Sequence, residues 1–395
     1  MKQKDAVTIP VLPWYYGPLS RQDAEGLLKE SNIGTFLIRE SVNFPGDYTL
    51  CISHNGSVEH YRILHVNNSY TLDEEELFDT LEALVQHYSR RDDGLCCTLR
   101  SPLEKLGPLV SPGGIECFQS TGWLIEGAEL TIEGSIGRGD FAEVCKAKLN
   151  GSSVAAKVIK QLSESSVLGL HEASAMTIAG IHPNLVRFIG LVSEPAAECL
   201  YLLTEFCPGG CLLNWLRTRG QAQLDQRQQL SLAINIASAV QYLQLRQLIH
   251  RDIACCNVFI TGEPGIAKLG DFGMSRRVDQ CERTGRLPVK WTAPEAILNS
   301  EFSFASDIWS LGVFLWELYS FGRLPYPGIR VKDVVSEVES GYQLPPPKDC
   351  PVPVYECMRR TWQLDPQQRP SADDVLVTLN REYNLLLGRG CSADN

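Results

Sequence analysis

The feature that most constrains this 395-residue chain is a series of short motifs that follow one another through its last two-thirds. The first three are a glycine-rich stretch, a lysine in a strand-like run and a glutamate in a helical run. Three further short motifs follow. In chain order the segments are IGRGDFAEV (136–144), VAAK (154–157), LHEASAM (170–176), HRDIACCN (250–257), DFG (271–273) and APE (293–295). Each could arise by chance, but their order and spacing together could not plausibly do so.

Each motif taken alone has an ordinary structural interpretation as well as a functional one. A glycine-rich turn between two strands lets the backbone close over phosphate groups, where a Cβ atom would clash. Taken alone, such a turn is more often a simple hairpin, and a strand lysine is more often a solvated edge residue. As a set, the six segments resemble the eukaryotic protein-kinase family over residues 130–385. The resemblance implies a bilobal fold, with a strand-rich lobe, a helical lobe and a cleft between them.

The same resemblance implies catalytic roles for five polar residues. Lys157 would hold the α- and β-phosphates of ATP, and Glu172 would orient Lys157. Asp271 and Asn257 would bind two Mg²⁺ ions, for which Mn²⁺ is an alternative. Asp252 would accept the proton of the substrate hydroxyl. These residue types suit phosphoryl transfer, which is mainly a matter of positioning and charge neutralisation.

Further residues are implied to bind the nucleotide or to support the catalytic loop. Asp307 would brace that loop from a helix, and Glu295 would pair with Arg369 as part of the scaffold. The expected nucleotide-binding residues besides Lys157 are Ile136, Gly137, Gly139, Val144, Ala155, Thr204, Glu205 and Cys207.

The sequence around the catalytic loop is similar to tyrosine kinases. Serine/threonine kinases usually carry a lysine where this chain has Ala254, and LPVKWTAPE contains the Lys290-Trp291 pair typical of tyrosine kinases. Cytoplasmic tyrosine kinases usually have an arginine where Cys256 stands, so a planar donor near the acceptor is lost. Ala142 also replaces the third loop glycine. These departures keep one alternative open, a weakly active or inactive pseudokinase that acts as a phosphotyrosine-binding adaptor.

Residues 14–100, ahead of the kinase-like segment, predict a small domain of strands and helices. Strand-like runs at 35–40, 47–53 and 58–64 lie between helical patterns that begin after Ser20 and at Leu81. Asn55-Gly56, between the last two runs, is a strong hairpin signal. We therefore expect an α+β multidomain chain made of an N-terminal tail (1–13), a first domain (14–100), an extended Pro/Gly-rich linker (101–122), a kinase domain (123–386) and a C-terminal tail (387–395).

Three stretches of the first domain resemble SH2 domains, in which two helices flank an antiparallel sheet. They are WYYG (14–17), FLIRES (36–41) and HYRI (60–63). The resemblance implies that Arg39, on the central strand, grips phosphotyrosine with its guanidinium group, and that Arg21, Ser41 and His60 complete the pocket. Strand alternation turns Arg39 toward the core side, where a charge is unfavourable unless an anion meets it.

An SH2 domain followed by a tyrosine kinase is similar to the C-terminal Src kinase (Csk) subfamily. No tyrosine lies between Asp271 and Glu295, where many tyrosine kinases are activated by phosphorylation, and none follows Tyr383. The resemblance implies a cytoplasmic enzyme that phosphorylates the inhibitory C-terminal tyrosine of Src-family kinases. Phosphotyrosine-containing adaptor or scaffold proteins would recruit it to the membrane. The subfamily's SH3 domain does not fit in the 13 residues before Trp14, so we expect a shorter isoform or a truncated sequence.

Composition disfavours several other classes of protein. The chain has 36 Lys and Arg against 47 Asp and Glu, a net charge of −11, which disfavours binding to nucleic acid. No stretch reaches the ~18 apolar residues that cross a bilayer, and Lys2 stands where an N-myristoyl anchor needs glycine, so we expect no direct membrane anchor. The 14 cysteines contain no two CxxC pairs, so the sequence gives no support for a zinc site. With no secretion signal, we expect reduced thiols and a cytosolic protein.

Overall fold

The computed structural model describes residues 14–16, 19–41, 44, 47–66, 69–73, 75–103, 115–125, 129–138, 142–160, 164–194, 199–220, 224–262, 265–278 and 287–390. The predicted N-terminal tail, the predicted nucleotide-binding residue Gly139 and residues 391–395 of the predicted C-terminal tail lie outside these residues. Contacts divide the chain into two compact units, Met1–Gly180 with Phe188–Glu205 and Ile181–Arg187 with Phe206–Asn395. Each unit is described by itself.

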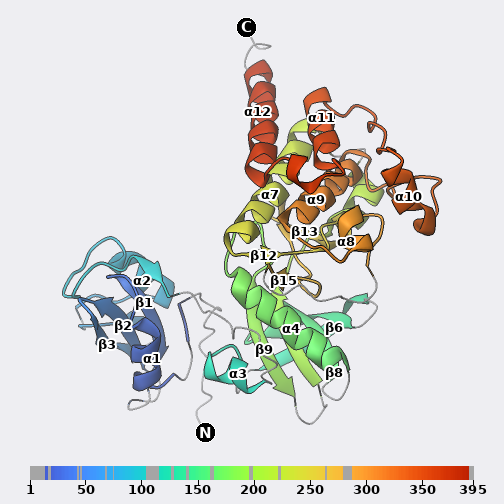
Figure 1. Cartoon of the computed structure of the whole chain (residues 1–395). Helices are drawn as coiled ribbons and strands as arrows, with labels where there is room; N and C mark the ends of the chain where they lie inside the picture. Colours follow the sequence, from blue (N-terminus) through green and yellow to red (C-terminus); the bar gives the residue numbers. More distant parts are fainter. Residues whose placement is uncertain are drawn as a thin grey trace. The chain divides into compact units, whose positions relative to one another are not determined.

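The first part of the chain folds as a five-stranded sheet with a helix on each face (Figure 1). The strand order is β4-β3-β2-β1-β5, with β1 to β4 antiparallel and β5 parallel to β1. This is the expected SH2 arrangement. The elements are α1 (Arg21–Leu28), β1 (Thr35–Glu40), β2 (Tyr48–His54), β3 (Ser57–Val66), β4 (Ser69–Thr71), α2 (Leu81–Tyr88) and β5 (Ser101–Pro102).

Local sequence explains where these elements begin and turn. The Ser20 hydroxyl accepts the backbone N–H of Asp23 and begins α1, and Thr80 begins α2 in the same way. Asn55 and Gly56 both have positive φ (48° and 79°), as a tight turn between twisted strands requires. The predicted hairpin is therefore confirmed.

The sheet separates two apolar cores, because successive side chains on a strand point to opposite faces. Phe36, Ile38, Leu50 and Ile52 pack toward α2, whereas the alternate residues Leu37 and Cys51 pack toward α1. Burying each large apolar side chain contributes about 1.5–3 kcal/mol. The two-sided burial of β1 and β2 fixes their register, because a shift of one residue would exchange the two faces.

The segment predicted as an extended linker, 101–122, is not extended throughout. It opens with β5 and contains a short helix, α3 (Glu116–Ser120). Phe118 on α3 is buried, and its carbonyl accepts the backbone N–H groups of Trp123 and Leu124. The apolar surface buried by Phe118 explains why helix forms in a segment whose Pro and Gly content predicts an extended chain.

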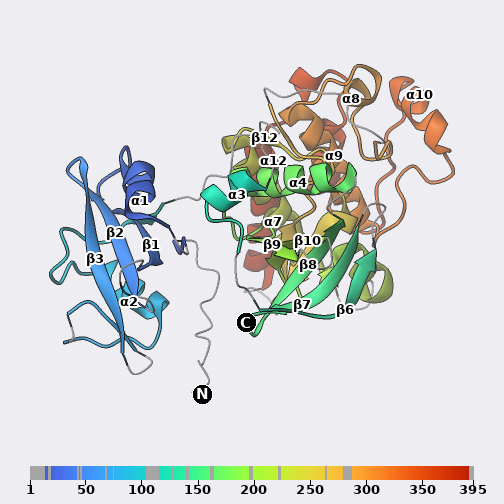
Figure 2. The same cartoon turned by 90° about the horizontal axis from the view of Figure 1, so that it is seen from below.

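The strands that follow form an antiparallel sheet of order β6-β7-β8-β10-β9, with helix α4 lying on it (Figure 2). The elements are β6 (Leu130–Arg138), β7 (Glu143–Leu149), β8 (Ser152–Lys160), α4 (Glu164–Ala179), β9 (Phe188–Glu194) and β10 (Cys199–Glu205). Helix and sheet approach closely at Gly169, where a Cβ atom would lie 2.3 Å from the Ile159 side chain. Glycine at this position lets α4 sit close to β8.

The second unit is mainly helical, as the sequence predicts. Its central helix α9 is buried along most of its length and packs against α7 and α11. At Gly312 on α9, a Cβ atom would collide with Thr361 of α11. The elements are β11 (Gly210–Cys211), α5 (Leu212–Trp215), η2 (Leu216–Gly220), α7 (Gln226–Leu245), β12 (Leu248–Ile249), η3 (Cys255–Asn257), β13 (Val258–Thr261), β14 (Ile266–Leu269), β15 (Arg276–Arg277), α8 (Pro294–Leu298), α9 (Phe304–Tyr319), η4 (Val331–Asp333), α10 (Val334–Glu339), α11 (Val352–Thr361), η5 (Pro366–Gln368) and α12 (Ala372–Gly390).

Helix α12 continues through residues 387–390, which the sequence predicts to belong to a tail. No proline or polar turn cluster interrupts the helical pattern of NREYNLLLGRG. Among the described residues, no helix combines the length and the apolar character needed to cross a membrane.

Candidate functional site

Lys157 and Glu172 form a close ion pair in the first unit. Lys157 lies on β8, opposite Val144 of β7 and Leu202 of β10, and Glu172 lies on α4. The Lys157 Nζ donates to Glu172 Oε2 at 2.6 Å, and the Glu172 side chain is almost fully buried. A buried carboxylate needs such a partner, so the pair fixes the lysine on the sheet.

The glycine-rich segment joins β6 to β7. Gly137 pairs with Val144 across these strands, and the register shifts between Ser135 and Gly137, as at a β-bulge. A Cβ atom on Gly137 would meet nothing within 4 Å, and Ile136 is 52% exposed. Surface is thus left open at Ile136 and Gly137, where the sequence predicts contacts to ATP.

The remaining predicted nucleotide-binding residues line strands and the connection between the two units. Ala155 on β8 is the register partner of Thr204 on β10, and Glu205 ends β10. Cys207 follows in the second unit and is buried. One boundary between the two units falls in this segment, after Glu205.

The loop 250–257 is held by a buried carboxylate on α9. Asp307 accepts the backbone N–H groups of His250 (2.7 Å) and Arg251 (2.9 Å). The Asn257 side-chain nitrogen donates to the carbonyl of Asp252 at 2.8 Å and closes the loop on itself. These bonds position the Asp252 carboxylate, and the predicted brace by Asp307 is present.

Burial raises the pKa of Asp252 to about 6, with a smaller contribution from the nearby Asp271 carboxylate, while the hydrogen bond from Asn257 opposes the shift. The carboxyl group is therefore ionised at neutral pH and protonated in mild acid. A general base works best with a pKa near the working pH. The geometry and the pKa of Asp252 both suit proton acceptance from a substrate hydroxyl.

Asp271 sits in a backbone conformation that L-residues rarely adopt, with φ of 58°. The next residue, Phe272, is buried and packs edge-on against the His250 ring at 5.1 Å between centroids. Anchoring Phe272 turns Asp271 toward the surface, and the Asp271 Oδ1 accepts the N–H of Gly273 at 3.3 Å. Strained residues of this kind cluster at functional sites.

The oxygen atoms of Asp271 and Asn257 fit a divalent hard cation. Magnesium prefers carboxylate and amide oxygens as ligands and keeps several waters. Because the Asn257 amide nitrogen is engaged with the Asp252 carbonyl, its amide oxygen points away from that bond. The donor set therefore suits Mg²⁺, and Mn²⁺ is compatible with the same ligands.

A second buried carboxylate, Glu317 on α9, supports the same loop and was not predicted. Glu317 Oε2 accepts the backbone N–H of Cys255 at 3.1 Å and the indole N–H of Trp291 at 2.7 Å. It links the catalytic loop to the LPVKWTAPE segment. Lys290 in that segment is buried and donates to the Pro325 carbonyl at 2.7 Å, so it contributes to structure there. The side chain of Cys256 is exposed beside this arrangement.

Arg217 and Arg219 lie on η2, and the sequence leaves two interpretations of them equally open, docking of an acidic face of the substrate or a solvated helix end. Both are exposed, but the Arg217 guanidinium donates to the Gly322 carbonyl at 2.9 Å. That bond ties Arg217 to the backbone of its own unit.

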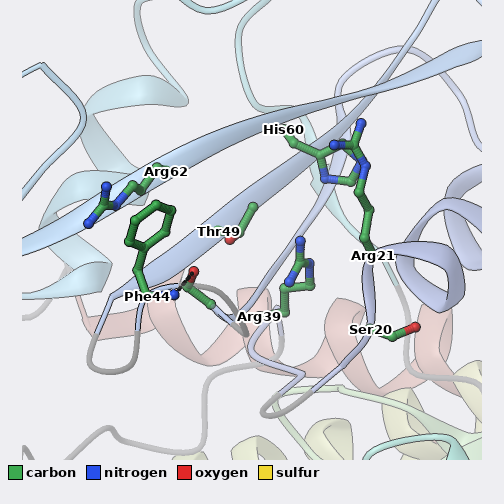
Figure 3. Close-up of a pocket in the computed structure, with 8 residues that line it drawn as sticks. Ser20, Arg21, Arg39, Phe44, Thr49, His60 and Arg62 are labelled. Carbon is green, nitrogen blue, oxygen red and sulfur yellow. Dashed lines mark hydrogen bonds between the residues drawn. The ribbon is translucent and has the colours of Figure 1, made fainter.

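A cavity of about 360 Å³ opens on the α1 face of the SH2-like sheet (Figure 3). Four of its lining residues are those predicted to bind phosphotyrosine. The full set is Ser20, Arg21, Arg39, Ser41, Phe44, Thr49, His60 and Arg62. Three guanidinium groups line this one small cavity, and their positive charge suits a dianionic phosphate.

Arg39 lies at the floor of this cavity and is 7% exposed. Its Nη1 donates to the Glu40 carbonyl at 3.2 Å, whereas its Nε is buried without a hydrogen-bond partner in the described part of the chain. Arg39 was expected on the central strand, but β1 lies between β2 and the two-residue β5, and the central strand is β2. The sequence could not indicate the short β5.

His60 and Arg21 are held in the cavity by one carboxylate. Glu25 Oε1 accepts Arg21 Nε at 2.8 Å and lies 3.1 Å from His60 Nε2, and the other His60 nitrogen lies 3.2 Å from Cys51 Sγ. Desolvation lowers the pKa of His60, against the opposing effect of Glu25. His60 is therefore mainly neutral at pH 7, and the Glu25 carboxylate accepts its single N–H at Nε2.

Four pocket residues were missed by the sequence reasoning: Ser20, Phe44, Thr49 and Arg62. Two of them carried a usable signal. Arg62 has the same strand parity as His60, and Thr49 is the register partner of Arg39. The Arg62 guanidinium lies 3.5 Å from the centroid of the Phe44 ring and pairs with Asp47 at 2.6 Å.

Comparison with known proteins agrees with this architecture. Residues 130–379 match the family described as protein tyrosine and serine/threonine kinase, and residues 14–88 match the SH2 domain. The chain is 38% identical over 391 residues to the tyrosine-protein kinase csk-1 of Caenorhabditis elegans, covering 94% of this chain and 72% of that protein. This chain belongs to the Csk-like protein-tyrosine kinases.

Two mammalian relatives support the same assignment. The megakaryocyte-associated tyrosine-protein kinase of Rattus norvegicus is 38% identical, covering 97% of this chain and 81% of the relative. The Mus musculus protein of that name is also 38% identical, covering 95% and 72%. The Csk-like chain is thus a non-receptor protein-tyrosine kinase that carries an SH2 domain, as its sequence predicts.

Proposed function

We propose that this kinase transfers the γ-phosphate of ATP to the inhibitory C-terminal tyrosine of Src-family kinases. The proposal rests on membership of the Csk-like family together with one structural observation, the close pair of Lys157 and Glu172. In this proposal the enzyme works in the cytoplasm, and phosphotyrosine-containing adaptor or scaffold proteins recruit it to the membrane through its SH2 domain.

Nucleotide binding would use the strand-rich half of the kinase domain. Lys157, held by Glu172, would contact the α- and β-phosphates as a fixed positive charge. Gly137 would let the backbone approach the phosphates, because nothing crowds that position. Val144 and Ala155 would pack on the adenine, and the backbone at Thr204, Glu205 and Cys207 would bind its polar edge. Ile136 and Gly139 would complete this surface.

Proton transfer and metal binding would use the helical half. Mg²⁺, when bound, supplies charge neutralisation at the phosphates. Asp271 and Asn257 would hold the metal through their oxygen atoms. Asp252, positioned by the loop that Asp307 braces, would accept the tyrosine hydroxyl proton, which requires its carboxylate form.

The SH2 pocket would bind a phosphotyrosine of the recruiting protein. Arg39 would form a bidentate pair with the phosphate. Its buried Nε, which has no hydrogen-bond partner among the described residues, favours an anion there. Arg21, Ser41 and His60 would complete the pocket from the walls of the same cavity.

The substrate is tested with the full chain, Mg-ATP and a catalytically inactive Src-family kinase, with the phosphorylated site mapped by mass spectrometry. We expect phosphate on the C-terminal tail tyrosine, and no signal when that tyrosine is replaced by phenylalanine. Phosphorylation at other tyrosines with the tail left unmodified would contradict the proposed substrate while leaving tyrosine-kinase activity intact.

One observation favours the pseudokinase alternative. Cys256, which is exposed, stands where cytoplasmic tyrosine kinases usually have an arginine. Wild-type activity on a tyrosine peptide that disappears in Asp252→Asn would exclude an adaptor-only role. A Cys256→Arg variant separates the remaining cases. Activity that appears only in this variant would favour the adaptor.

A further inference from the structure

A cluster of metal-binding side chains lies in the SH2 domain outside the phosphotyrosine pocket. It consists of His54, at the end of β2, and the adjacent cysteines Cys96 and Cys97, which follow α2. One ring nitrogen and two sulfur atoms of these residues all lie within 4.8 Å of one another. The chain bends at 95–97, and this bend lets two neighbouring thiols approach the same imidazole.

The imidazole of His54 has an unsatisfied atom. Its Nδ1 is buried and finds no hydrogen-bond partner within the described residues, although buried polar atoms are nearly always paired. The other nitrogen, Nε2, lies 2.9 Å from the side-chain nitrogen of Asn55. His54 thus has a buried ring nitrogen without a partner among the described residues, and one of its ring nitrogens lies within 4.8 Å of both thiols, which is the arrangement expected of a ligand set.

The surroundings hold this cluster in place. The backbone N–H of Cys96 donates to the Tyr61 hydroxyl oxygen at 2.8 Å, and both cysteines pack against the core on the α2 side of the sheet. His54 is fixed by the tight turn that begins at Asn55. All three candidate ligands are partly exposed, so an ion can reach them from solvent.

We propose that His54, Cys96 and Cys97 bind one Zn²⁺ ion. Thiolate and imidazole are the ligands that zinc prefers in proteins, and this set leaves one tetrahedral position for water. Bonds of about 2.3 Å to sulfur and about 2.0 Å to nitrogen place tetrahedral ligand atoms about 3.5–3.8 Å apart. The present separations of up to 4.8 Å need to close by at most about 1.3 Å, which side-chain rotation provides.

Zinc binding at this site would release a fixed number of protons. Both thiols lose their protons on binding, so two protons leave the protein for each zinc ion. Coordination through Nδ1 puts the remaining imidazole proton on Nε2. A half-turn of the Asn55 side-chain amide then offers its oxygen to that proton, which is the usual support for a metal-bound histidine.

The proposed zinc site is separate from the phosphotyrosine pocket. His54 has the parity of Leu50 and Ile52, which face α2, whereas the pocket residue Thr49 has the opposite parity. Phosphopeptide binding therefore reports whether a zinc-site variant is still folded, without involving the proposed ligands.

The test is calorimetric titration of the full chain with Zn²⁺ under reducing conditions, in two buffers of different ionisation enthalpy. We expect one equivalent of tight binding with release of two protons. His54→Ala and the double variant Cys96→Ser/Cys97→Ser should each weaken binding by at least on the order of 100-fold, because lost ligands matter more than lost supporting contacts. Both variants should keep wild-type affinity for a phosphotyrosine peptide.

The matched control is His87→Ala, which alters a second candidate group of residues, Glu76, His87 and Asp93, in the same domain. This control should keep the full zinc affinity. Unchanged affinity in His54→Ala, or loss of binding in the His87 variant, would overturn the proposal. If the cysteine variant does not fold, a cobalt titration of the wild-type chain decides, because missing thiolate-to-cobalt charge-transfer absorption would also overturn it.

Discussion

At the scale of single residues, the two proposed sites depend on charges that the fold holds away from bulk water. Arg39 is buried beneath a cavity, and its Nε has no hydrogen-bond partner among the described residues. The Asp252 carboxyl is desolvated enough to raise its pKa. Each residue carries an electrostatic cost in the free protein. We infer that phosphate binding to Arg39 and proton transfer to Asp252 offset this electrostatic cost.

Replacing Arg39 should weaken phosphopeptide binding even when the positive charge is kept. Arg39→Lys keeps the charge but loses the two-pronged geometry, and charge-assisted hydrogen bonds contribute about 1.5–3 kcal/mol. We therefore expect a loss in affinity of roughly 10- to 100-fold, and a larger loss in Arg39→Ala. Calorimetry with a phosphotyrosine peptide measures both. The exposed Arg91→Ala serves as the control, and equal affinities in all three variants would refute the pocket.

The raised pKa of Asp252 sets the acid limb of the pH–rate profile. The base must be ionised to accept a proton, and a pKa of about 6 means that it is protonated in mild acid. The value of kcat/KM should therefore fall about tenfold per pH unit below about pH 6 and be flat just above it. Peptide phosphorylation measured from pH 5 to pH 8 gives the profile.

The pH experiment needs a control, because burial also raises the pKa of the nearby Glu317 carboxyl to about 7. Glu317→Gln keeps an acceptor for the Cys255 N–H but cannot titrate. The midpoint of the acid limb should stay near pH 6 in this variant. A midpoint that moves or disappears would assign the titration to Glu317 instead.

At the scale of elements, a helix or turn could be predicted when the interactions that stabilise it lie within a few residues of the chain. The hairpin at Asn55-Gly56 and the helix start at Ser20 follow from turn and capping chemistry within a few residues, and both were predicted in type and place. The helix from Leu81 was predicted from its apolar spacing, but its cap, Thr80, was not. Helix α3 was missed because its cause is the tertiary burial of Phe118.

In the phosphotyrosine pocket too, side chains whose neighbours are distant in the sequence were harder to predict. Arg21, Arg39, Ser41 and His60 were predicted from the resemblance to SH2 domains, whereas Arg62 was missed although it shares the strand parity of His60. Its place opposite Thr49 depends on the register of β2 and β3, which only the folded sheet supplies. Glu317 could not be predicted either, because an acidic residue in an apolar helix shows no partner until the Cys255 and Trp291 N–H groups are brought to it.

The pair between α8 and the segment after η5 should be a major source of stability for the helical unit. Arg369 donates to both carboxylate oxygens of Glu295 at 2.6 and 2.8 Å, and its side chain is fully buried. Glu295→Ala leaves that cation buried without its counterion, and we expect a loss of about 3–5 kcal/mol in the free energy of unfolding. Denaturant unfolding followed by tryptophan fluorescence measures the loss.

A surface pair of the same kind is the control for this prediction. Arg330 and Asp333 lie within hydrogen-bond distance of each other, but the Arg330 side chain is 73% exposed. Asp333→Ala should cost no more than about 1 kcal/mol. Similar losses in the free energy of unfolding for the Glu295 and Asp333 variants would mean that burial does not set the contribution of the Glu295–Arg369 pair to stability.

At the scale of the whole molecule, a phosphotyrosine reader and a tyrosine kinase occupy one chain, and the sites proposed for them use different chemistry. The SH2 pocket gathers positive groups to hold a phosphate, whereas the Asp252 loop provides a carboxylate that takes a proton. The resemblance to known kinases predicted this organisation correctly, because the motifs lie within the segments that the family matches. The residue roles remain proposals that the variants above test separately.

The most direct test of the central claim is phosphoamino-acid analysis of a protein substrate after incubation with Mg-ATP and either the wild-type chain or Asp252→Asn. We expect phosphotyrosine alone from the wild-type chain. The variant, which retains the shape of the loop but lacks the base, should lose at least about 100-fold in rate. Phosphoserine from the wild-type chain, or equal phosphotyrosine from both proteins, would contradict the account.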